Sequence, residues 1–275
     1  MGKVKVGKVS IGDKEDVTII AGPCVIETEE LLFQVAKTLK SITAELGLGF
    51  IFKCSYDKAN RMSYSSYRGP GVEKGMKMLA NLKKELGIPI VVDVHKVTEI
   101  ELVSQTADML QIPAFLCRQT DLVVEAARTM LPLHIKKGQF MSPEDMKYIA
   151  EKAGKVGNNQ IVLCERGTFF GYHDLVVDFR SIPIMCSLGY PVSFDFTHSL
   201  QSPGAKGGAS GGKGKFAEHY AKCGVVSGAD ALFFETHPDP ASSPSDAAVI
   251  FPLEKVKNLL TKVKKLCSIK KKEKI

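Results

Sequence analysis

The chain has 275 residues, 44% hydrophobic and 24% charged, a composition typical of one globular domain of barrel size or of two small domains. No apolar run reaches the roughly 18 residues that a membrane span requires. The first ten residues also lack the apolar stretch of a signal peptide, so we expect a cytoplasmic protein that does not bind membranes. Residues 261–275 supply +6 of the net charge of +7, so the rest of the chain has no strong basic character. The sequence also has no tryptophan, and both features argue against nucleic-acid binding.

Short, continuous apolar runs recur along the chain and predict strands that are buried on both faces. Amphipathic stretches at Glu29–Leu46 and Val72–Leu86 predict helices between them, another helix is expected to begin at Ser142-Pro143, and Leu253–Leu266 is expected to form the last. This alternation predicts a single (β/α)8 TIM barrel over residues 1–275. The eight predicted strands are Val17–Ala21, Phe50–Lys53, Ile90–Val94, Met109–Ile112, Leu133–Lys136, Ile161–Leu163, Val192–Phe196 and Ala231–Phe234.

The two ends of the chain lie outside this pattern. Residues 1–16 are expected to form a short N-terminal extension, a β-hairpin under the barrel, and residues 268–275 form a basic tail. An open, doubly wound sheet is the alternative architecture. Its first strand would normally end in a glycine-rich turn, whereas Ala21-Gly-Pro-Cys24 does not follow the pattern GxGxxG.

Polar side chains gather at the carboxyl ends of the predicted strands, where the active sites of barrel enzymes lie. Each of them alone could be a solvated strand end, but six cations should converge on one mouth. Cations so close together repel one another unless anions neutralise them, which predicts ligands with more than one phosphate or carboxylate group. The six cations are Lys53, Lys58, Arg61, Arg118, Lys136 and Arg166.

A mixed set of possible metal ligands follows the first, seventh and eighth strands, which become neighbours when a barrel closes. Cys24, His198, Glu235 and Asp246 together would suit Zn²⁺, Fe²⁺ or Mn²⁺. Spacing alone leaves open that Cys24 is a buried thiol and that His198 is an ordinary hydrogen-bonding residue. None of the seven cysteines forms a CxxC pair, so a zinc knuckle or a thioredoxin-like motif is excluded.

The glycine-rich run Pro203–Gly214 is too long for a simple turn. It is interpreted either as a mobile lid over the mouth or as a flexible surface loop. A Walker-type phosphate loop is not supported, because no GK[ST] sequence completes that pattern.

A series of motifs lies between Val17 and Leu253. They are Ile20-Ala-Gly-Pro-Cys24, Phe52-Lys-Cys-Ser-Tyr-Asp-Lys-Ala-Asn-Arg61, Ser66-Tyr-Arg-Gly-Pro-Gly71, Asp93-Val-His95, Gln111-Ile-Pro-Ala114, Arg118-Gln-Thr-Asp121, Lys136-Lys-Gly-Gln139, Glu165-Arg-Gly167, Phe170-Gly-Tyr172, Thr197-His198 and Glu235-Thr-His-Pro-Asp239. Together they resemble the 3-deoxy-manno-octulosonate 8-phosphate synthases. The stretch Lys58-Ala-Asn-Arg61 distinguishes this family from the related synthases that use erythrose 4-phosphate, whose sequence at this position resembles KPRTS.

The resemblance implies a transferase of lipopolysaccharide sugar synthesis that condenses phosphoenolpyruvate with D-arabinose 5-phosphate and water, without an organic cofactor. It also implies a homotetramer in which a neighbour's Arg118 reaches into the site. The catalytic residues that it implies are His95, Lys58, Asp246 and Cys24. The implied substrate contacts are Lys53, Ser55 and Lys58 at the phosphoenolpyruvate carboxylate, Ala114, Lys136 and Arg166 at its phosphate, Asn60 and Arg61 at the sugar phosphate, and in addition Ser63, Asp93, Gln111 and Gln201.

The resemblance also bears on the metal. Members that work without a metal have asparagine at the position of Cys24, so this chain resembles the branch that uses a divalent metal, with Cys24, His198, Glu235 and Asp246 as ligands. Two positions depart from the family pattern. Met62 stands where a serine is usual, a hydroxyl that Ser63 could replace, and Lys213-Gly-Lys215 stands where an arginine is usual.

Three other functions remain open from the sequence. A 3-deoxy-arabino-heptulosonate 7-phosphate synthase that uses erythrose 4-phosphate is the nearest, and Lys58-Ala-Asn-Arg61 argues against it. A synthase for an unphosphorylated sugar would leave Arg61 and Arg118 without an anion. A catalytically inactive, anion-binding barrel would bind phosphate tightly without turnover.

Overall fold

The computed structural model describes residues 2–12, 16–61, 63–206 and 209–273. Its centre is a ring of parallel strands in which each strand pairs with the next along the chain, and the last, β14, pairs with both β11 and β3. This closure confirms the predicted (β/α)8 barrel. The strands of the ring are β3 (Thr18–Gly22), β4 (Phe50–Lys53), β5 (Ile90–Asp93), β6 (Met109–Ile112), β7 (Leu133–Lys136), β8 (Ile161–Glu165), β11 (Val192–Asp195) and β14 (Ala231–His237).

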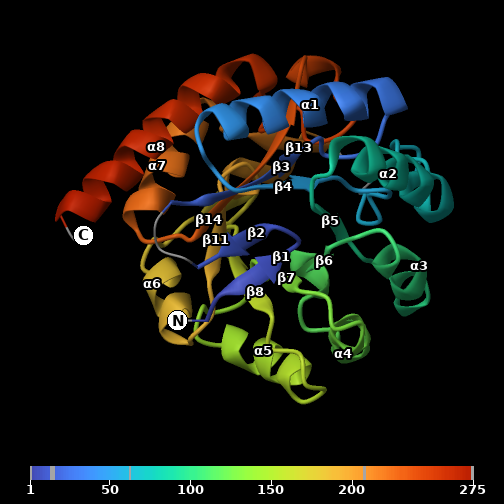
Figure 1. The fold of residues 1–275 in the computed structure, drawn as a ribbon, viewed down its shortest axis with the longest axis horizontal. Helices are drawn as coiled ribbons and strands as arrows, with labels where there is room; N and C mark the ends of the chain where they lie inside the picture. The colour runs from blue at the N-terminus through green and yellow to red at the C-terminus, as the bar shows by residue number, and fades with distance from the viewer. Residues whose placement is uncertain (1, 13–15, 62, 207–208, 274–275) are drawn as a thin grey trace.

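Helices surround this ring on all sides (Figure 1). They are α1 (Glu29–Glu45), α2 (Val72–Leu86), α3 (Ile100–Ser104), α4 (Thr120–Arg128), α5 (Met146–Gly154), α6 (Ser181–Ser187), α7 (Ala217–Val226) and α8 (Val256–Glu273). Short 3-10 turns occur at Val97–Glu99, Ala114–Leu116, His198–Leu200, Gly214–Phe216, Pro240–Ser242 and Leu253–Lys255. The sequence pattern placed α1 and α2 almost to the residue, because their apolar stripes are regular and because Gly87 ends α2 in a left-handed conformation.

Two helix ends differ from the prediction. The helix expected to begin at Ser142-Pro143 starts later, at Met146, so the predicted N-cap was wrong. The Ser142 hydroxyl instead bonds to the carboxylate of Glu144 two residues on, and the Met146 N–H bonds to the Pro143 carbonyl in a turn. At the other end, α8 continues to Glu273 and therefore includes the described part of the predicted basic tail.

The N-terminal extension forms the predicted β-hairpin, from β1 (Val4–Val6) and β2 (Val9–Ile11). Its buried Val4, Val6 and Ile11 pack against residues that the strands direct into the barrel, such as Ile20 and Phe233. Figure 1 shows the hairpin inside the ring of helices. Because this hairpin closes the amino-terminal end of the barrel, the carboxyl ends of the strands are the side on which a cavity can form.

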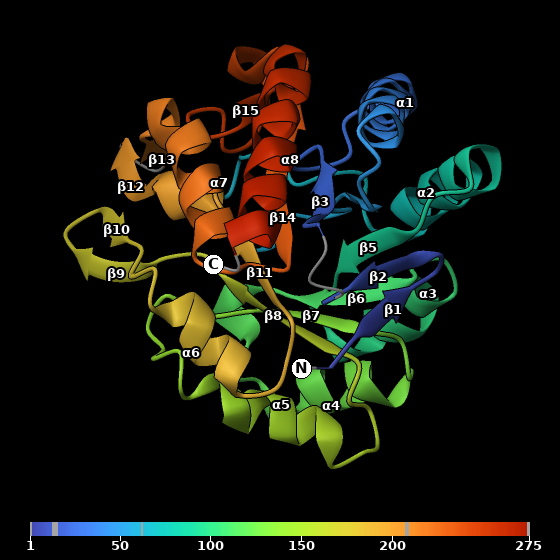
Figure 2. The ribbon, with the colours of Figure 1, turned by 60° about the vertical axis from the view of Figure 1, so that its left-hand side comes forward.

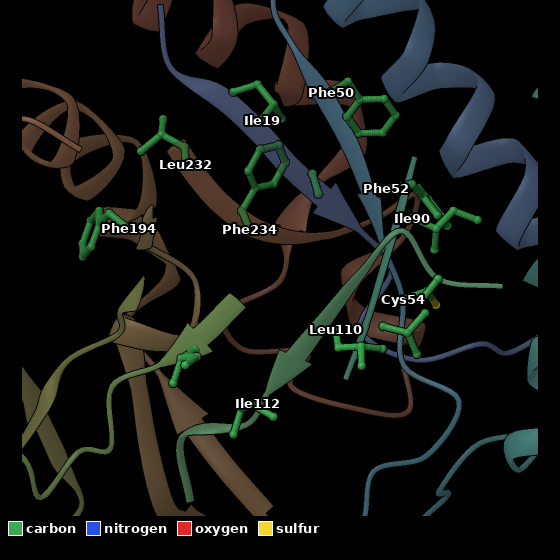
Figure 3. Packing of buried hydrophobic residues seen from close by; sticks show 14 of the residues in the cluster. Ile19, Phe50, Phe52, Cys54, Ile90, Leu110, Ile112, Phe194, Leu232 and Phe234 are labelled. Carbon is green, nitrogen blue, oxygen red and sulfur yellow. The ribbon is translucent and has the colours of Figure 1, made fainter. Parts of the chain in front are cut away.

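Alternation along the strands creates two cores. Ile19, Phe52 and Phe234 belong to the outer cluster between strands and helices, which Figure 3 shows with other members of that cluster. Their neighbours point into the barrel, where the apolar layer of the hairpin gives way to polar side chains near the carboxyl ends. These buried polar residues are Lys53, Asp93, Gln111, His134, Lys136, Ser193, Asp195 and Glu235.

Three further strand pairings lie beyond the ring. Strands β9 (Thr168–Gly171) and β10 (Asp174–Val176) form one hairpin, β12 (Gln201–Lys206) and β13 (Ala209–Gly212) form another, and β15 (Phe251–Pro252) pairs in parallel with the end of β14. The glycine-rich run is thus a hairpin in its described part. It lies beside the β9–β10 hairpin (Figure 2), to which Lys213 is joined by its 2.8 Å ion pair with Asp174. None of the described helices combines the length and apolarity that a membrane crossing demands.

Candidate active site

A cavity of about 650 Å³ opens at the carboxyl ends of the strands. It brings together most of the residues that the sequence pointed to, although they come from all parts of the chain. The predicted site residues that line it are Lys53, Lys58, Asn60, Arg61, Asp93, His95, Gln111, Ala114, Lys136, Arg166, His198, Gln201, Glu235 and Asp246. Two others, Ser55 and Cys24, are buried beside residues that line it.

Lys53 at the end of β4 is the centre of one buried charge cluster. Its Nζ lies 2.6 Å from the Ser55 Oγ, 3.4 Å from Asp93 Oδ1 and 3.6 Å from Glu235 Oε1. Lys58 contacts the same Glu235 oxygen at 3.4 Å. Burial alone would raise the pKa of Glu235, but Lys58, His198 and Lys53 outweigh it and hold that pKa below its usual value, so the carboxylate stays ionised.

Lys136 at the end of β7 belongs to a second cluster, around Asp195. The Asp195 Oδ2 lies 2.6 Å from Lys136 Nζ and 2.6 Å from His198 Nδ1, while its Oδ1 accepts the backbone N–H of His198 at 2.9 Å. The Lys136 Nζ also lies 3.9 Å from the ring centre of Phe233. Asp195 is completely buried, and His198 and Lys136 hold its pKa well below the usual value against the effect of burial.

His95 lies beside the first cluster and faces the cavity. Its Nε2 is 3.4 Å from Asp93 Oδ2, and its ring packs edge-on against Tyr56 with 5.4 Å between ring centres. The Tyr56 hydroxyl donates to Glu99 at 2.6 Å, which fixes the tyrosine in turn. The imidazole thus packs against Tyr56 and lies near Asp93, while its Nε2 has no hydrogen-bond partner among the described residues.

Arg166 follows β8 and is buried, but its charge is not matched by a salt bridge among the described residues. Its Nη2 donates to the Gln201 side-chain oxygen at 2.8 Å, and its Nη1 is buried without a hydrogen-bond partner there. Burial lowers the pKa of Arg166 from its usual value, although a guanidinium stays protonated at neutral pH. A buried donor without a partner at a cavity wall is a position where a bound anion or a water can accept the hydrogen bond.

Three of the four predicted metal ligands lie together. Ligand atoms of Cys24, Glu235 and Asp246 are all within 4.8 Å of one another. His198 stands next to them, with its Nε2 3.4 Å from Glu235 Oε2, while its Nδ1 faces Asp195. Burial and the nearby carboxylate of Glu235 raise the pKa of the Cys24 thiol, so the thiolate that a metal requires needs a cation beside it. The donor set of one thiol, one imidazole and two carboxylates fits a divalent transition metal.

The outer part of the predicted site is more loosely arranged. Asn60 and Arg61 line the cavity at its rim, and Arg61 donates to the backbone carbonyls of Tyr67 and Pro244 at 3.1 and 3.4 Å. Ser63 and Arg118 are not among the residues that line the cavity of this chain. The expected convergence of six cations on one mouth therefore holds for five of them within a single chain. Met62, the departure from the family pattern, lies outside the described residues.

Several residues of the site were not singled out from the sequence. His134 nearly ends a buried strand, a position that could have revealed it, yet a histidine there is common. Gln139 lines the cavity with a buried side-chain oxygen, and Ser245 bonds to both Cys24 and Asp246. What the sequence did not predict is the pairing of Asp93, Asp195 and Glu235 with the buried lysines, which already neutralises much of the lysine charge.

Comparisons with known proteins agree with this geometry. The DAHP synthetase I family matches residues 2–272. The 2-dehydro-3-deoxyphosphooctonate aldolase of Bartonella bacilliformis is 49% identical over 257 residues, which cover 94% of this chain and 91% of that protein. The protein of the same name from Methylococcus capsulatus is 50% identical over 91% of this chain and 88% of its own length. That of Geotalea uraniireducens is 47% identical over 98% of this chain and 99% of its own.

Proposed function

Because this chain belongs to the DAHP synthetase I family, we propose that it condenses phosphoenolpyruvate with D-arabinose 5-phosphate and water to give 3-deoxy-D-manno-octulosonate 8-phosphate and phosphate. The relatives named above are called 2-dehydro-3-deoxyphosphooctonate aldolase. The matches to those of Bartonella bacilliformis and Geotalea uraniireducens cover nearly the whole length of each protein. The observation that carries the proposal is the cavity itself. Buried Lys53, Lys136 and Arg166 lie in its wall, and Arg61 lies at its rim, as two phosphorylated substrates require.

In this reaction one carbon–carbon bond and one carbon–oxygen bond form, and one carbon–oxygen bond breaks. The C3 carbon of phosphoenolpyruvate attacks the aldehyde carbon of the sugar, whose oxygen takes a proton and becomes a hydroxyl. The oxygen of water adds to C2, and the bond between C2 and the bridging oxygen breaks to release phosphate. Water loses both protons, one of which balances the new hydroxyl and the other the departing phosphate.

The inner half of the cavity is proposed to hold phosphoenolpyruvate. Lys53, Ser55 and Lys58 would bind its carboxylate, since both lysines contact one oxygen of Glu235 and Ser55 contacts Lys53. The backbone at Ala114 and the side chains of Lys136 and Arg166 would bind its phosphate. The free donor at Arg166 Nη1 supports this assignment, because a phosphate oxygen would satisfy it. These cations would stabilise the charge that the phosphate gains as it leaves.

The outer half is proposed to hold the sugar phosphate. Asn60 and Arg61 lie there, and the aldehyde would then point inward toward His95 and Lys58. Both of these side chains face the cavity and can carry a proton, so either can supply the one that the aldehyde oxygen gains. Asp93, 3.4 Å from His95 Nε2, would hold the imidazole in place.

A homotetramer is proposed in addition, with Arg118 of a neighbouring chain completing the sugar-phosphate site. Two features support it. Arg118 is exposed and does not line the cavity of its own chain. The β9–β10 hairpin carries the exposed aromatic residues Phe169, Phe170 and Tyr172, and aromatic groups of this kind are enriched in interfaces between chains.

A divalent metal is proposed to bind Cys24, Glu235, Asp246 and His198. The support is the meeting of the first three at the cavity and the chemistry of the donor set. When bound there, such an ion would polarise an oxygen of the aldehyde or of water. A cytoplasmic location is proposed because the seven cysteines are all free thiols, as in proteins of a reducing compartment.

The test is phosphate release from phosphoenolpyruvate with arabinose 5-phosphate or erythrose 4-phosphate, each before and after chelation and metal addition. We expect turnover with arabinose 5-phosphate that chelation abolishes and metal restores. Turnover with erythrose 4-phosphate alone would contradict the proposed substrate. Turnover that chelation does not change, in a protein with no bound metal, would contradict the proposed metal site but not the proposed reaction. Tight phosphate binding without any turnover would indicate an anion-binding protein.

A further inference from the structure

A buried histidine below the cavity has no part in the reaction described so far. His134 lies on β7, two residues before Lys136, and is completely buried. Both of its ring nitrogens have close partners, Nδ1 at 2.9 Å from the Gln111 Oε1 and Nε2 at 2.7 Å from the Ser193 Oγ. Its ring stacks on Phe233 with 5.7 Å between the ring centres. The imidazole is thus held on both edges and on one face.

These contacts determine which nitrogen carries the proton. An amide oxygen can only accept, so the Nδ1 of His134 must donate to Gln111 Oε1. Burial, with Lys136 nearby, lowers the pKa of His134 to about 3, so the ring is neutral and has a single proton. Nε2 is then the acceptor for the Ser193 hydroxyl at 2.7 Å, a shorter contact than the 3.3 Å from that hydroxyl to the Leu163 carbonyl oxygen. With its oxygen bound to His134, Gln111 has its NH₂ group left for the cavity that it lines.

We propose that His134 is a positioning residue, which holds the carboxamide of Gln111 so that its NH₂ group and not its oxygen faces phosphoenolpyruvate. The inference rests on the proposed function, because it assigns a role in binding that substrate. An amide turns about its last bond at little cost, and the oxygen presented to an anion would repel it. The Nδ1–H of His134 prevents that turn without adding a further charge near Lys53 and Lys136.

Two substitutions separate positioning from packing. In His134→Asn the side-chain NH₂ takes the place of Nδ1 and can still donate to Gln111, whereas His134→Leu fills similar space and cannot. We expect the KM for phosphoenolpyruvate to rise about tenfold in His134→Leu, as for one lost hydrogen bond to a charged group, and to stay within about threefold of the parent in His134→Asn. The KM for arabinose 5-phosphate and kcat should change less. Equal losses in both variants would overturn the proposal.

A double-mutant cycle tests whether His134 acts through Gln111. If it does, His134→Leu adds little to the effect of Gln111→Leu on the KM for phosphoenolpyruvate. Full additivity of the two effects would contradict the inference. Thermal unfolding of each variant shows whether that variant is folded, so that only folded proteins enter the comparison of KM values.

A spectroscopic measurement tests the hydrogen bond without turnover. The ¹⁵N spectrum of the parent protein, with His134 assigned by comparison with His134→Asn, should show protonated Nδ1 and bare Nε2, unchanged between about pH 6 and 9. A proton on Nε2, or titration in that range, would overturn the inference even if the enzyme is active. Absence of phosphoenolpyruvate turnover in the parent would instead contradict the proposed function. The spectrum would still show which nitrogen of His134 carries the proton.

Discussion

Replacing Asp195 with asparagine should destabilise the barrel, because this one carboxylate forms the ion pair with Lys136 and accepts hydrogen bonds from His198. It is completely buried, and its Oδ2 lies 2.6 Å from both Lys136 Nζ and His198 Nδ1. Removing one partner of a buried ion pair leaves the other uncompensated, at a cost of about 3–5 kcal/mol. In a chain of this length each kcal/mol lowers the Tm by about 2–4 °C, so we expect a fall of about 6–20 °C.

A matched control exists on the surface. Asp178 forms a 2.7 Å ion pair with Arg180, and the two side chains are 52% and 84% exposed. Because water and salt screen that pair, Asp178→Asn should leave the Tm unchanged within error. Both variants would be melted at pH 7 with circular dichroism as the readout, and the KM for phosphoenolpyruvate would be measured beside them. Equal shifts in Tm, or none in Asp195→Asn, would refute the reasoning.

The pH dependence of the same variant follows from the sign of the shift. Burial alone would raise the pKa of Asp195, but His198 and Lys136 lower it well below its usual value. A carboxylate with a depressed pKa in the folded state stabilises the protein above its unfolded pKa, about 3.9, and loses that effect as pH falls through the folded pKa. The part of the Tm difference between parent and variant that comes from the Asp195 charge should therefore shrink as the pH falls below about 4.

Three further outcomes are expected. Cys24→Asn should lower the metal content of the purified protein and its sensitivity to chelator, and unchanged values would exclude the thiol as a ligand. Arg61→Ala should raise the KM for arabinose 5-phosphate at least about tenfold in steady-state kinetics, while that for phosphoenolpyruvate stays near the parent value. Gly22→Ala should sharply reduce the yield of folded protein, since a Cβ there would lie 1.9 Å from the Lys53 carbonyl oxygen, whereas Gly171→Ala, with nothing within 4 Å, should be tolerated.

The architecture was predictable because it depends on patterns within short segments. A buried parallel strand is apolar on both faces, so its bounds can be identified from an apolar run. The structure has the predicted bounds for the strands Phe50–Lys53 and Leu133–Lys136. The start of α5 was not predictable in the same way. A serine before a proline is a common helix start, but Ser142 bonds instead to Glu144 in a turn. The hydrophobic periodicity of the sequence does not show which of two local hydrogen bonds such a serine forms.

The site was predictable as a set of residues and not as a set of contacts. Strand ends could be identified, which is why Lys53, Lys136 and Arg166 were expected to meet. Which carboxylate faces which lysine depends on the register between strands and on side-chain direction. Asp195, the partner of Lys136, comes from β11, two strands away from β7 in the closed sheet. Arg118 shows the same limit, because its place in a site depends on another chain.

The way the cations are paired has a consequence for how two phosphorylated substrates are told apart. The lysines Lys53, Lys58 and Lys136 each have a carboxylate within 3.6 Å, so much of their charge is already balanced before any substrate arrives. Arg166 and Arg61 form no such ion pair among the described residues, and they contact amide and carbonyl oxygens instead. Net positive charge is therefore concentrated at two guanidiniums, one buried in the wall and one at the rim. On the proposed function, those two positions fix where the two phosphates bind, and the lysines between them act mainly as hydrogen-bond donors to the reacting end.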